Sequence, residues 1–219
     1  MKNVNISTIL IISFVLISSN IFSNENKTIM TDKLDGPRYR LEKLHYENSS
    51  GEKGVTIFEY SENGIMNTAK WKLLDESRNS SNFYEYDKDR NLIKKYREFS
   101  DGITSTQLYE YDKNENLINE YFQRSDGISG ITKYEYGENR NLIKANCEGL
   151  NGWFYGVITY SNDEKGNRLK ADIIQKNKNT GTIDYSYDEN GNLIREYWDF
   201  NGKWSQTFIY EYKEIISIQ

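Results

Sequence analysis

The chain has 219 residues, of which 28 are basic and 33 are acidic, and its formal net charge is −5 at pH 7. Binding to phosphates needs a concentrated basic surface, so this balance argues against nucleic acid as a partner. The single cysteine, Cys147, excludes an intramolecular disulfide framework and a multi-cysteine zinc site.

The N-terminus has the pattern of a secretory signal peptide over residues 1–23. Lys2 supplies positive charge, residues 6–17 form an apolar stretch too short to span a bilayer comfortably, and Ser23 is a small residue suited to cleavage. We predict cleavage after Ser23, with Ser19 as the second choice, and an uncleaved membrane anchor is the alternative. No other apolar run could cross a membrane as a helix. We therefore expect no membrane span after signal removal and a location outside the cytoplasm: periplasm, cell surface or secreted.

Residues 24–37 are polar and are predicted to be a disordered lead, and residues 38–219 are predicted to form one repeat domain. Its first strands are expected at Tyr39–Tyr46 and Val55–Tyr60, where apolar and polar residues alternate. A Tyr-x-Tyr-like sequence then recurs every 25 or 26 residues, and a fixed period of this size indicates a repeat architecture. The first aromatic residue of each copy is Phe58, Tyr84, Tyr109, Tyr134, Tyr160, Tyr185 or Tyr210.

Each repeat unit is predicted to contain two strands and two tight turns. At Asp188–Asn192 the aspartate can accept a local backbone hydrogen bond, and Gly191 can take a positive φ. In units without this glycine we expect the positive φ at Asp89, Asn114 or Asn139. The second turns are Asp101-Gly102, Asp126-Gly127, Asn151-Gly152, Thr180-Gly181 and Asn201-Gly202, most of them typical hairpin dipeptides.

The whole pattern predicts an all-β fold of about fourteen antiparallel strands with no helix. An open twisted sheet rarely exceeds about ten strands without curling or splitting. We therefore expect a repeat array of antiparallel β-hairpins with a period of about 25 residues, folded as a curled or spiral open sheet.

The candidate ligand site comes from one unit that departs from the repeat. Strand alternation is expected to place Tyr185, Tyr187, Leu193, Arg195 and Tyr197 on one face. In the fifth unit, Asn162 and Arg168 replace the Tyr/Leu pair, and Asp172 stands where a tyrosine stands elsewhere. This change is either repeat drift or a polar notch in an aromatic surface. The notch would form a ligand-binding site made of Asn162, Arg168 and Asp172 with Tyr160, Tyr185 and Tyr197.

Catalytic and metal chemistry find no support in the sequence. The only histidine, His45, has no nucleophile motif around it, and the glutamates that recur in each repeat favour cross-strand pairing with Lys and Arg. Asp87-x-Asp89-x-Asn91 begins like a calcium loop, but Leu92 occupies the position that needs glycine. We expect no enzyme activity, no metal and no cofactor.

The sequence Tyr-Ser-Tyr-Asp-Glu-Asn-Gly-Asn-Leu at 185–193 resembles the YD repeat of bacterial RHS-type and teneurin-like surface proteins, and the likeness covers Phe58 to Tyr212. This resemblance implies β-hairpins that spiral into a hollow shell, and some family members are linked with carbohydrate binding. The chain is expected to be a short member without the core or toxin domain. A looser resemblance, through Asn201-Gly202-Lys203-Trp204, is to MORN-like repeats.

Together these features predict an exported, non-catalytic binding or scaffold protein, with a glycan as the favoured ligand. The alternative is a protein–protein interaction module. In that case a partner strand would add to an open edge at Tyr39 or at Tyr210–Ile218.

Overall fold

The structure is a computed structural model that describes residues 38–150 and 155–215. The signal peptide and lead predicted over 1–37, and the Asn151-Gly152 turn, lie outside the described residues. The described part contains fourteen strands and no helix, so the all-β prediction is confirmed. The strands are β1 (Arg38–Asn48), β2 (Lys53–Tyr60), β3 (Met66–Leu73), β4 (Asn79–Tyr86), β5 (Leu92–Phe99), β6 (Thr104–Tyr111), β7 (Leu117–Arg124), β8 (Ser129–Tyr136), β9 (Leu142–Leu150), β10 (Gly156–Asn162), β11 (Arg168–Gln175), β12 (Thr180–Tyr187), β13 (Leu193–Asp199) and β14 (Ser205–Ile215).

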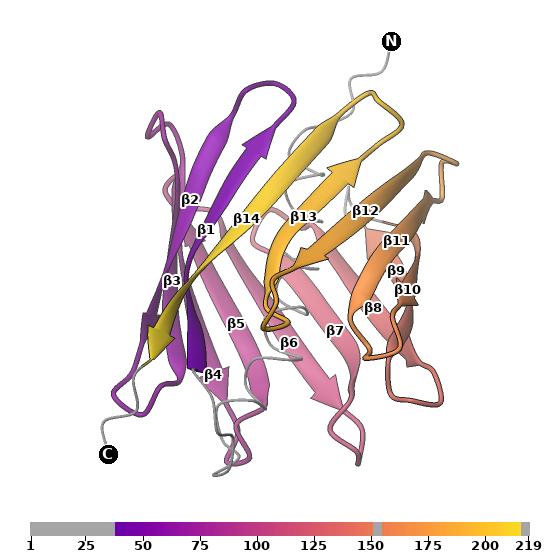
Figure 1. The fold of residues 1–219 in the computed structure, drawn as a ribbon. Helices are drawn as coiled ribbons and strands as arrows, with labels where there is room; N and C mark the ends of the chain where they lie inside the picture. Colours follow the sequence, from indigo (N-terminus) through magenta and orange to yellow (C-terminus); the bar gives the residue numbers. More distant parts are fainter. Residues whose placement is uncertain (1–37, 151–154, 216–219) are drawn as a thin grey trace.

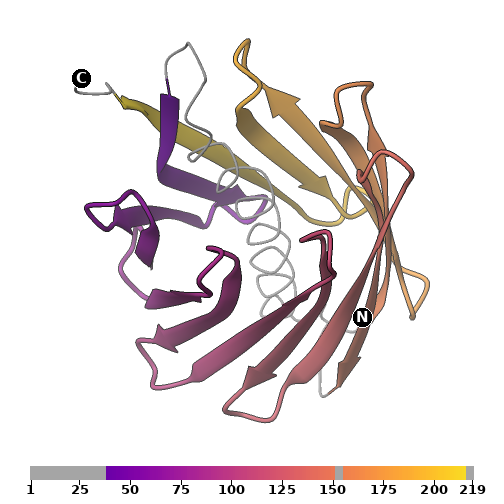
Figure 2. The same ribbon diagram turned by 90° about the horizontal axis from the view of Figure 1, so that it is seen from below.

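The strands form a closed barrel, so the prediction of an open curled sheet is wrong (Figures 1 and 2). Each strand pairs antiparallel with its neighbours in sequence, and β1 pairs with β14 from Arg38↔Ile215 to Asn48↔Gln206. Sheet twist accumulates from strand to strand and brings the two ends together, and closure then satisfies the backbone groups of both edge strands. The edges that were expected to be open at Tyr39 and from Tyr210 to Ile215 are therefore paired with each other.

A β-bulge follows each Tyr-x-Tyr hairpin and changes which residues face inward. Tyr187 pairs with Leu193, but Ser186 pairs with Arg195, so Ile194 is an extra residue. The bulge inverts the alternation of β13 beyond this point. Glu196 therefore faces inward and is fully buried, while Arg195 faces outward. The prediction that Arg195 and Tyr197 share a face with Tyr185 is wrong for this reason.

The inner surface of the barrel carries the hydrophobic core. Its buried side chains come from strands all round the wall and include Leu41, Phe58, Trp71, Leu92, Ile158, Ile173, Ile183, Trp198 and Phe208. Fully burying one such aliphatic or aromatic side chain stabilises the fold by about 1.5–3 kcal/mol.

The outer surface carries exposed ion pairs made by the recurring glutamate in four of the units. They join Glu59 to Lys70 at 2.6 Å, Glu85 to Lys94 at 2.7 Å, Glu135 to Lys144 at 3.2 Å and Glu211 to Lys43 at 2.9 Å. The predicted cross-strand pairing of the recurring glutamates with Lys and Arg is confirmed at these positions but is wrong for Glu110, which accepts from the Asn119 side-chain amide at 2.9 Å and the Tyr121 hydroxyl at 3.0 Å. Exposed pairs of this kind contribute at most about 1 kcal/mol each.

The turns use the predicted aspartate but not the predicted residue for positive φ. The Asp112 carboxylate accepts the backbone N–H groups of Asn114 and Asn116 at 2.8 and 2.9 Å. The positive φ falls one residue later than expected, at Arg90 (66°), Glu115 (62°) and Arg140 (59°), so the expectation at Asp89, Asn114 and Asn139 is wrong.

One of the predicted second turns is also misplaced. Thr180 and Gly181 are the first residues of β12, and the turn before them has its positive φ at Lys178 (67°). Over the described part of the chain, no helix is long and apolar enough to cross a membrane.

Candidate functional site

The departure of the fifth unit from the repeat lies on the inner surface of the barrel. Asn162 at the end of β10 pairs with Arg168 at the start of β11, where the sixth unit has Tyr187 and Leu193. The Asn162 side-chain amide donates to the carbonyl oxygen of Leu142 at 3.0 Å. In other units a tyrosine hydroxyl makes this bond, so the smaller asparagine keeps the contact without the aromatic ring.

The Arg168 guanidinium lies over the ring of Tyr160, 5.3 Å from the ring centroid. A cation over an aromatic face is stabilised by the ring quadrupole, by about 0.5–2 kcal/mol depending on exposure. Among the described residues, no carboxylate lies within 4.0 Å of this guanidinium. Arginine stays charged at any physiological pH, so within the described part of the chain Arg168 presents a positive charge without an ion-pair partner on the inner surface.

Three buried polar atoms surround this charge without a hydrogen-bond partner in the described part of the chain. They are the hydroxyl oxygens of Tyr160 and Tyr185 and the side-chain oxygen of Asn162. Burial raises the pKa of both tyrosine hydroxyls, so both stay protonated and can donate. An unsatisfied buried polar group costs about 1–3 kcal/mol, and such groups need an explanation. We refer to Tyr160, Asn162, Arg168 and Tyr185 as the Arg168 site.

Two of the six predicted site residues lie on the other side of the wall. Asp172 is exposed on the outer surface, where a carboxylate oxygen lies 3.2 Å from the Lys170 ammonium. Tyr197 also faces outward, with the Arg195 guanidinium 5.1 Å from its ring centroid. The bulge after each hairpin separates them from the other four, so the prediction that all six form one surface is wrong.

The sequence prediction missed two buried glutamates on the inner surface. Glu196 accepts hydrogen bonds from the Tyr210 hydroxyl at 2.7 Å and the Trp198 indole N–H at 3.0 Å. Glu120, at the equivalent place on β7, accepts from the Tyr134 hydroxyl at 2.8 Å and from the Gln107 side-chain amide. A signal was present, since the adjacent apolar residues Leu-Ile before each glutamate interrupt strand alternation and mark the bulge.

Comparison with known proteins assigns no family to this chain. No family model matches it, and no curated protein sequence matches it. Among solved structures, a porin-like protein from Bacteroides uniformis has 11% sequence identity and a TM-score of 0.48. The match covers 79% of this chain and 98% of that one.

Chains of TcdB2-TccC3 structures show a weaker structural similarity. One has 14% identity and a TM-score of 0.34 over 86% of this chain, and another has 15% identity and a TM-score of 0.34 over 88%. The chain spans about a tenth of their length, 11% and 10% respectively. Membership of the YD-repeat family therefore stays a prediction from the sequence.

A second group of charged residues lies on the inner surface along β5 and β7. Lys95 is only 4% exposed, and burial lowers its pKa to about 7. Burial also raises the pKa of Glu120 to about 7. Next to Lys95, the Arg97 side chain donates to the Ser80 hydroxyl at 2.8 Å and lies 4.3 Å from the ring centroid of Phe99.

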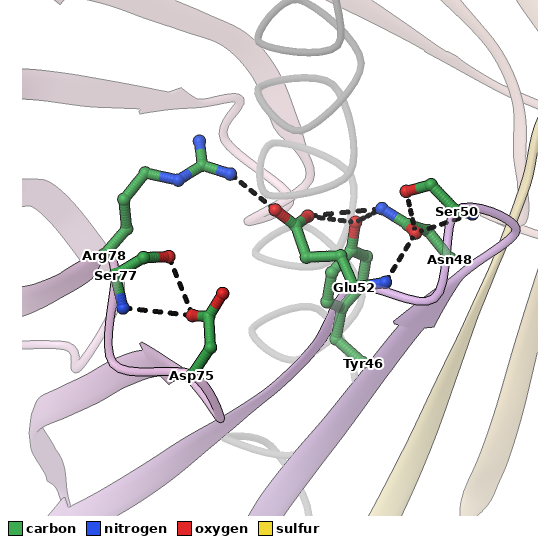
Figure 3. A network of polar contacts seen from close by, with 7 residues as sticks. All are labelled: Tyr46, Asn48, Ser50, Glu52, Asp75, Ser77 and Arg78. Carbon is green, nitrogen blue, oxygen red and sulfur yellow. Dashed lines mark hydrogen bonds and ion pairs between the residues drawn. The ribbon is translucent and has the colours of Figure 1, made fainter.

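A polar network at one rim ties the first two hairpins together (Figure 3). Glu52, in the turn after β1, accepts from the Arg78 guanidinium at 2.6 Å and from the Tyr46 hydroxyl at 3.1 Å. Asn48 accepts the Ser50 and Glu52 backbone N–H groups at 3.0 and 3.1 Å. These groups satisfy one another, so this network is explained as the anchoring of two turns.

The outer surface has a groove of about 630 Å³ over β6 to β9. Its lining includes Leu108, Tyr121, Gln123, Ile131, Glu148 and Tyr155. Its one charged lining residue, Glu148, is exposed and lies 3.6 Å from the Lys133 ammonium. The inner surface, with buried unpaired polar groups, is therefore the stronger candidate site.

The described residues contain no cluster of metal-binding side chains. Within residues 38–150 and 155–215 no group of three His, Cys, Asp or Glu side chains could hold a metal ion. His45 faces outward, with its Nε2 3.0 Å from a Glu211 carboxylate oxygen.

Proposed function

We propose that the protein is an exported, non-catalytic binding protein that holds a carbohydrate on the inner surface of its barrel, at the Arg168 site. The proposal rests on the buried polar atoms of Tyr160, Asn162 and Tyr185 that have no hydrogen-bond partner among the described residues and that lie near the Arg168 charge. A ligand that hydrogen-bonds these atoms would remove the free-energy cost of their burial.

The chemistry of the site suits a sugar. A sugar ring has apolar C–H faces that stack on aromatic rings, and its hydroxyls both donate and accept hydrogen bonds. The site offers the rings of Tyr160 and Tyr185, two hydroxyl donors and the Asn162 carbonyl acceptor. Binding sites of this kind combine an apolar surface with a few convergent polar groups.

The non-catalytic part of the proposal follows from how the ionisable groups are arranged. Glu120 and Glu196 lie on β7 and β13, which are six strands apart in the barrel, and both are engaged by neutral donors. Paired carboxylates that could act as acid and base on one bond are therefore not formed by these two residues. Export rests on the signal sequence predicted over residues 1–23.

The test compares the mature chain from Asn24 with a variant in which the fifth unit has the residues of the other units. Asn162→Tyr with Arg168→Leu restores the tyrosine and leucine of the repeat. Glycan-array binding should be lost, while the melting temperature should stay equal or rise, because the new tyrosine can donate to the Leu142 carbonyl oxygen.

The matched control for this experiment is Asp172→Tyr, which makes the same kind of change on the outer surface of β11. It should leave glycan binding unchanged. Equal binding by the wild type and the inner-surface double variant would show that the fifth unit has only drifted from the repeat.

A further inference from the structure

We infer that the carbohydrate bound at the Arg168 site is acidic, and that a carboxylate or sulfate group of the sugar pairs with the Arg168 guanidinium. This inference rests on the proposed carbohydrate binding and adds the chemical class of the ligand.

The two buried glutamates of the barrel wall accept hydrogen bonds from neutral groups, and Lys95 adds an electrostatic interaction with Glu120. Both oxygens of Glu196 accept hydrogen bonds, one from Tyr210 and one from Trp198. Both oxygens of Glu120 likewise accept, one from Tyr134 and one from Gln107. Neither glutamate makes an ion pair within 4.0 Å of Arg168 in the described structure.

The geometry around Arg168 favours a carboxylate on a sugar over a free ion. The planar guanidinium can bind a carboxylate or sulfate through two parallel hydrogen bonds. The guanidinium of Arg168 lies over the ring of Tyr160, 5.3 Å from its centroid, and this contact orients the plane of the guanidinium. The hydroxyls of Tyr160 and Tyr185 and the oxygen of Asn162 then remain for the hydroxyls of the same sugar.

The test uses the mature chain from Asn24 on an array of uronic-acid, sialylated and sulfated glycans. Each is printed beside its methyl-esterified or desulfated form, so that only the charge differs. We expect the acidic member of at least one pair to bind at least tenfold more tightly than its neutral form. Whether that pair is a carboxylate or a sulfate pair identifies the anion.

Substitutions at Arg168 assign the preference to this residue. Arg168→Gln should reduce the ratio of acidic-glycan to neutral-glycan affinity at least tenfold. Arg168→Lys keeps the charge but loses the two parallel donors of the guanidinium, so it should give an intermediate ratio. Arg195→Gln is the control, because Arg195 lies over Tyr197 in a similar arrangement on the outer surface. It should leave the ratio unchanged, and unchanged melting temperatures should accompany all three variants.

The outcomes separate this inference from the proposal on which it rests. Equal binding of acidic and neutral forms would keep carbohydrate binding and overturn the acidic class. A preference that survives in Arg168→Gln would overturn the assignment to Arg168. Failure of every glycan on the array to bind would overturn both.

Discussion

The Tyr136 hydroxyl donates a hydrogen bond of 2.9 Å to the carbonyl oxygen of Leu117, the residue that lies 19 positions earlier at the start of β7. The same bond, with the same separation of 19 residues, joins Tyr60 to Leu41, Tyr111 to Leu92 and Tyr212 to Leu193. The second tyrosine of these four copies therefore ties one hairpin to the preceding one. This contact gives a physical reason for the nearly constant repeat length.

Removal of one of these hydroxyls should destabilise the barrel measurably. Tyr136→Phe leaves the half-buried Leu117 carbonyl without this donor, and we expect a loss of about 1 kcal/mol in the free energy of unfolding. Urea denaturation of the wild type and the variant measures this loss. Tyr121→Phe is the control, because the Tyr121 hydroxyl bonds to Glu110 on the exposed outer surface and its loss should cost less than about 0.5 kcal/mol. Equal losses in the free energy of unfolding would mean that the inter-hairpin bond of Tyr136 contributes no more to stability than the exposed bond of Tyr121.

The turns offer a pair of substitutions with opposite expected signs. Arg90 and Gly191 occupy the same place in their turns, with φ of 66° and 82°. Arg90→Gly should stabilise the protein by about 0.5–1 kcal/mol, because glycine takes this conformation without the steric cost of a side chain, partly offset by a more flexible unfolded chain.

Gly191→Arg should destabilise the protein by a similar amount. A Cβ at Gly191 would meet no atom within 4 Å, so the cost comes from the backbone conformation alone. Thermal unfolding of both variants checks the pair. Two shifts of the same sign would contradict the turn conformations described above.

Much of the fold was predictable because its signals are local. The Tyr-x-Tyr period, the aspartate turns and the strand count can be read from the sequence without a three-dimensional structure. Barrel closure has no such signal, since β1 and β14 pair over a sequence separation of more than 150 residues, as for His45 and Ile209. Ring closure depends on the twist summed over all strands, which no single segment reports.

The candidate site was half predictable for a related reason. Asn162 and Arg168 stand out because they break the repeat, and they sit before the bulge, where strand alternation holds. Asp172 and Tyr197 lie after it, so a count in steps of two assigns them to the wrong face. The extra bulge residue in the second strand of each unit, Ile194 in the sixth, determines which face of the sheet the following residues occupy.

The buried Glu120 should make stability depend on pH in an unusual direction. Burial raises its pKa from 4.5 to about 7, so the folded state keeps a proton that the unfolded state releases between these values. The stability contributed by this proton is complete below pH 4.5 and is lost as pH rises to about 7. The groups that face it are Gln107 from β6, Tyr134 from β8 and Lys95 from β5.

Glu120→Gln removes this titration. Its free energy of unfolding should be close to that of the wild type at pH 4.5 and should exceed it at pH 8, as measured by urea denaturation at both pH values. Glu135→Gln is the control with the opposite sign. Hydrogen bonds from Lys144 and Asn146 lower the Glu135 pKa, so the stability that this carboxylate contributes is present above pH 4.5 and should be lost relative to the variant as pH falls below 4.5. A constant difference between wild type and Glu120→Gln would contradict the burial of an ionisable carboxyl.

Closure of the barrel can be tested by a disulfide between its first and last strands. His45 on β1 and Ile209 on β14 are direct partners in the register, and both side chains are exposed. Cα atoms of facing residues on antiparallel strands lie about 4.5–5.5 Å apart, within the range that a disulfide spans. In a background with Cys147→Ala, His45→Cys with Ile209→Cys should therefore form an intramolecular cross-link under mild oxidation. The cross-link would be seen as a change of mobility on non-reducing gels.

His45→Cys with Ile143→Cys is the matched control, because Ile143 is exposed on β9, five strands from β14, and should not cross-link. In an open spiral the first and last strands would lie at opposite ends of the array. Absence of the first cross-link from folded protein would therefore restore the open sheet and remove the closed inner surface on which the Arg168 site depends.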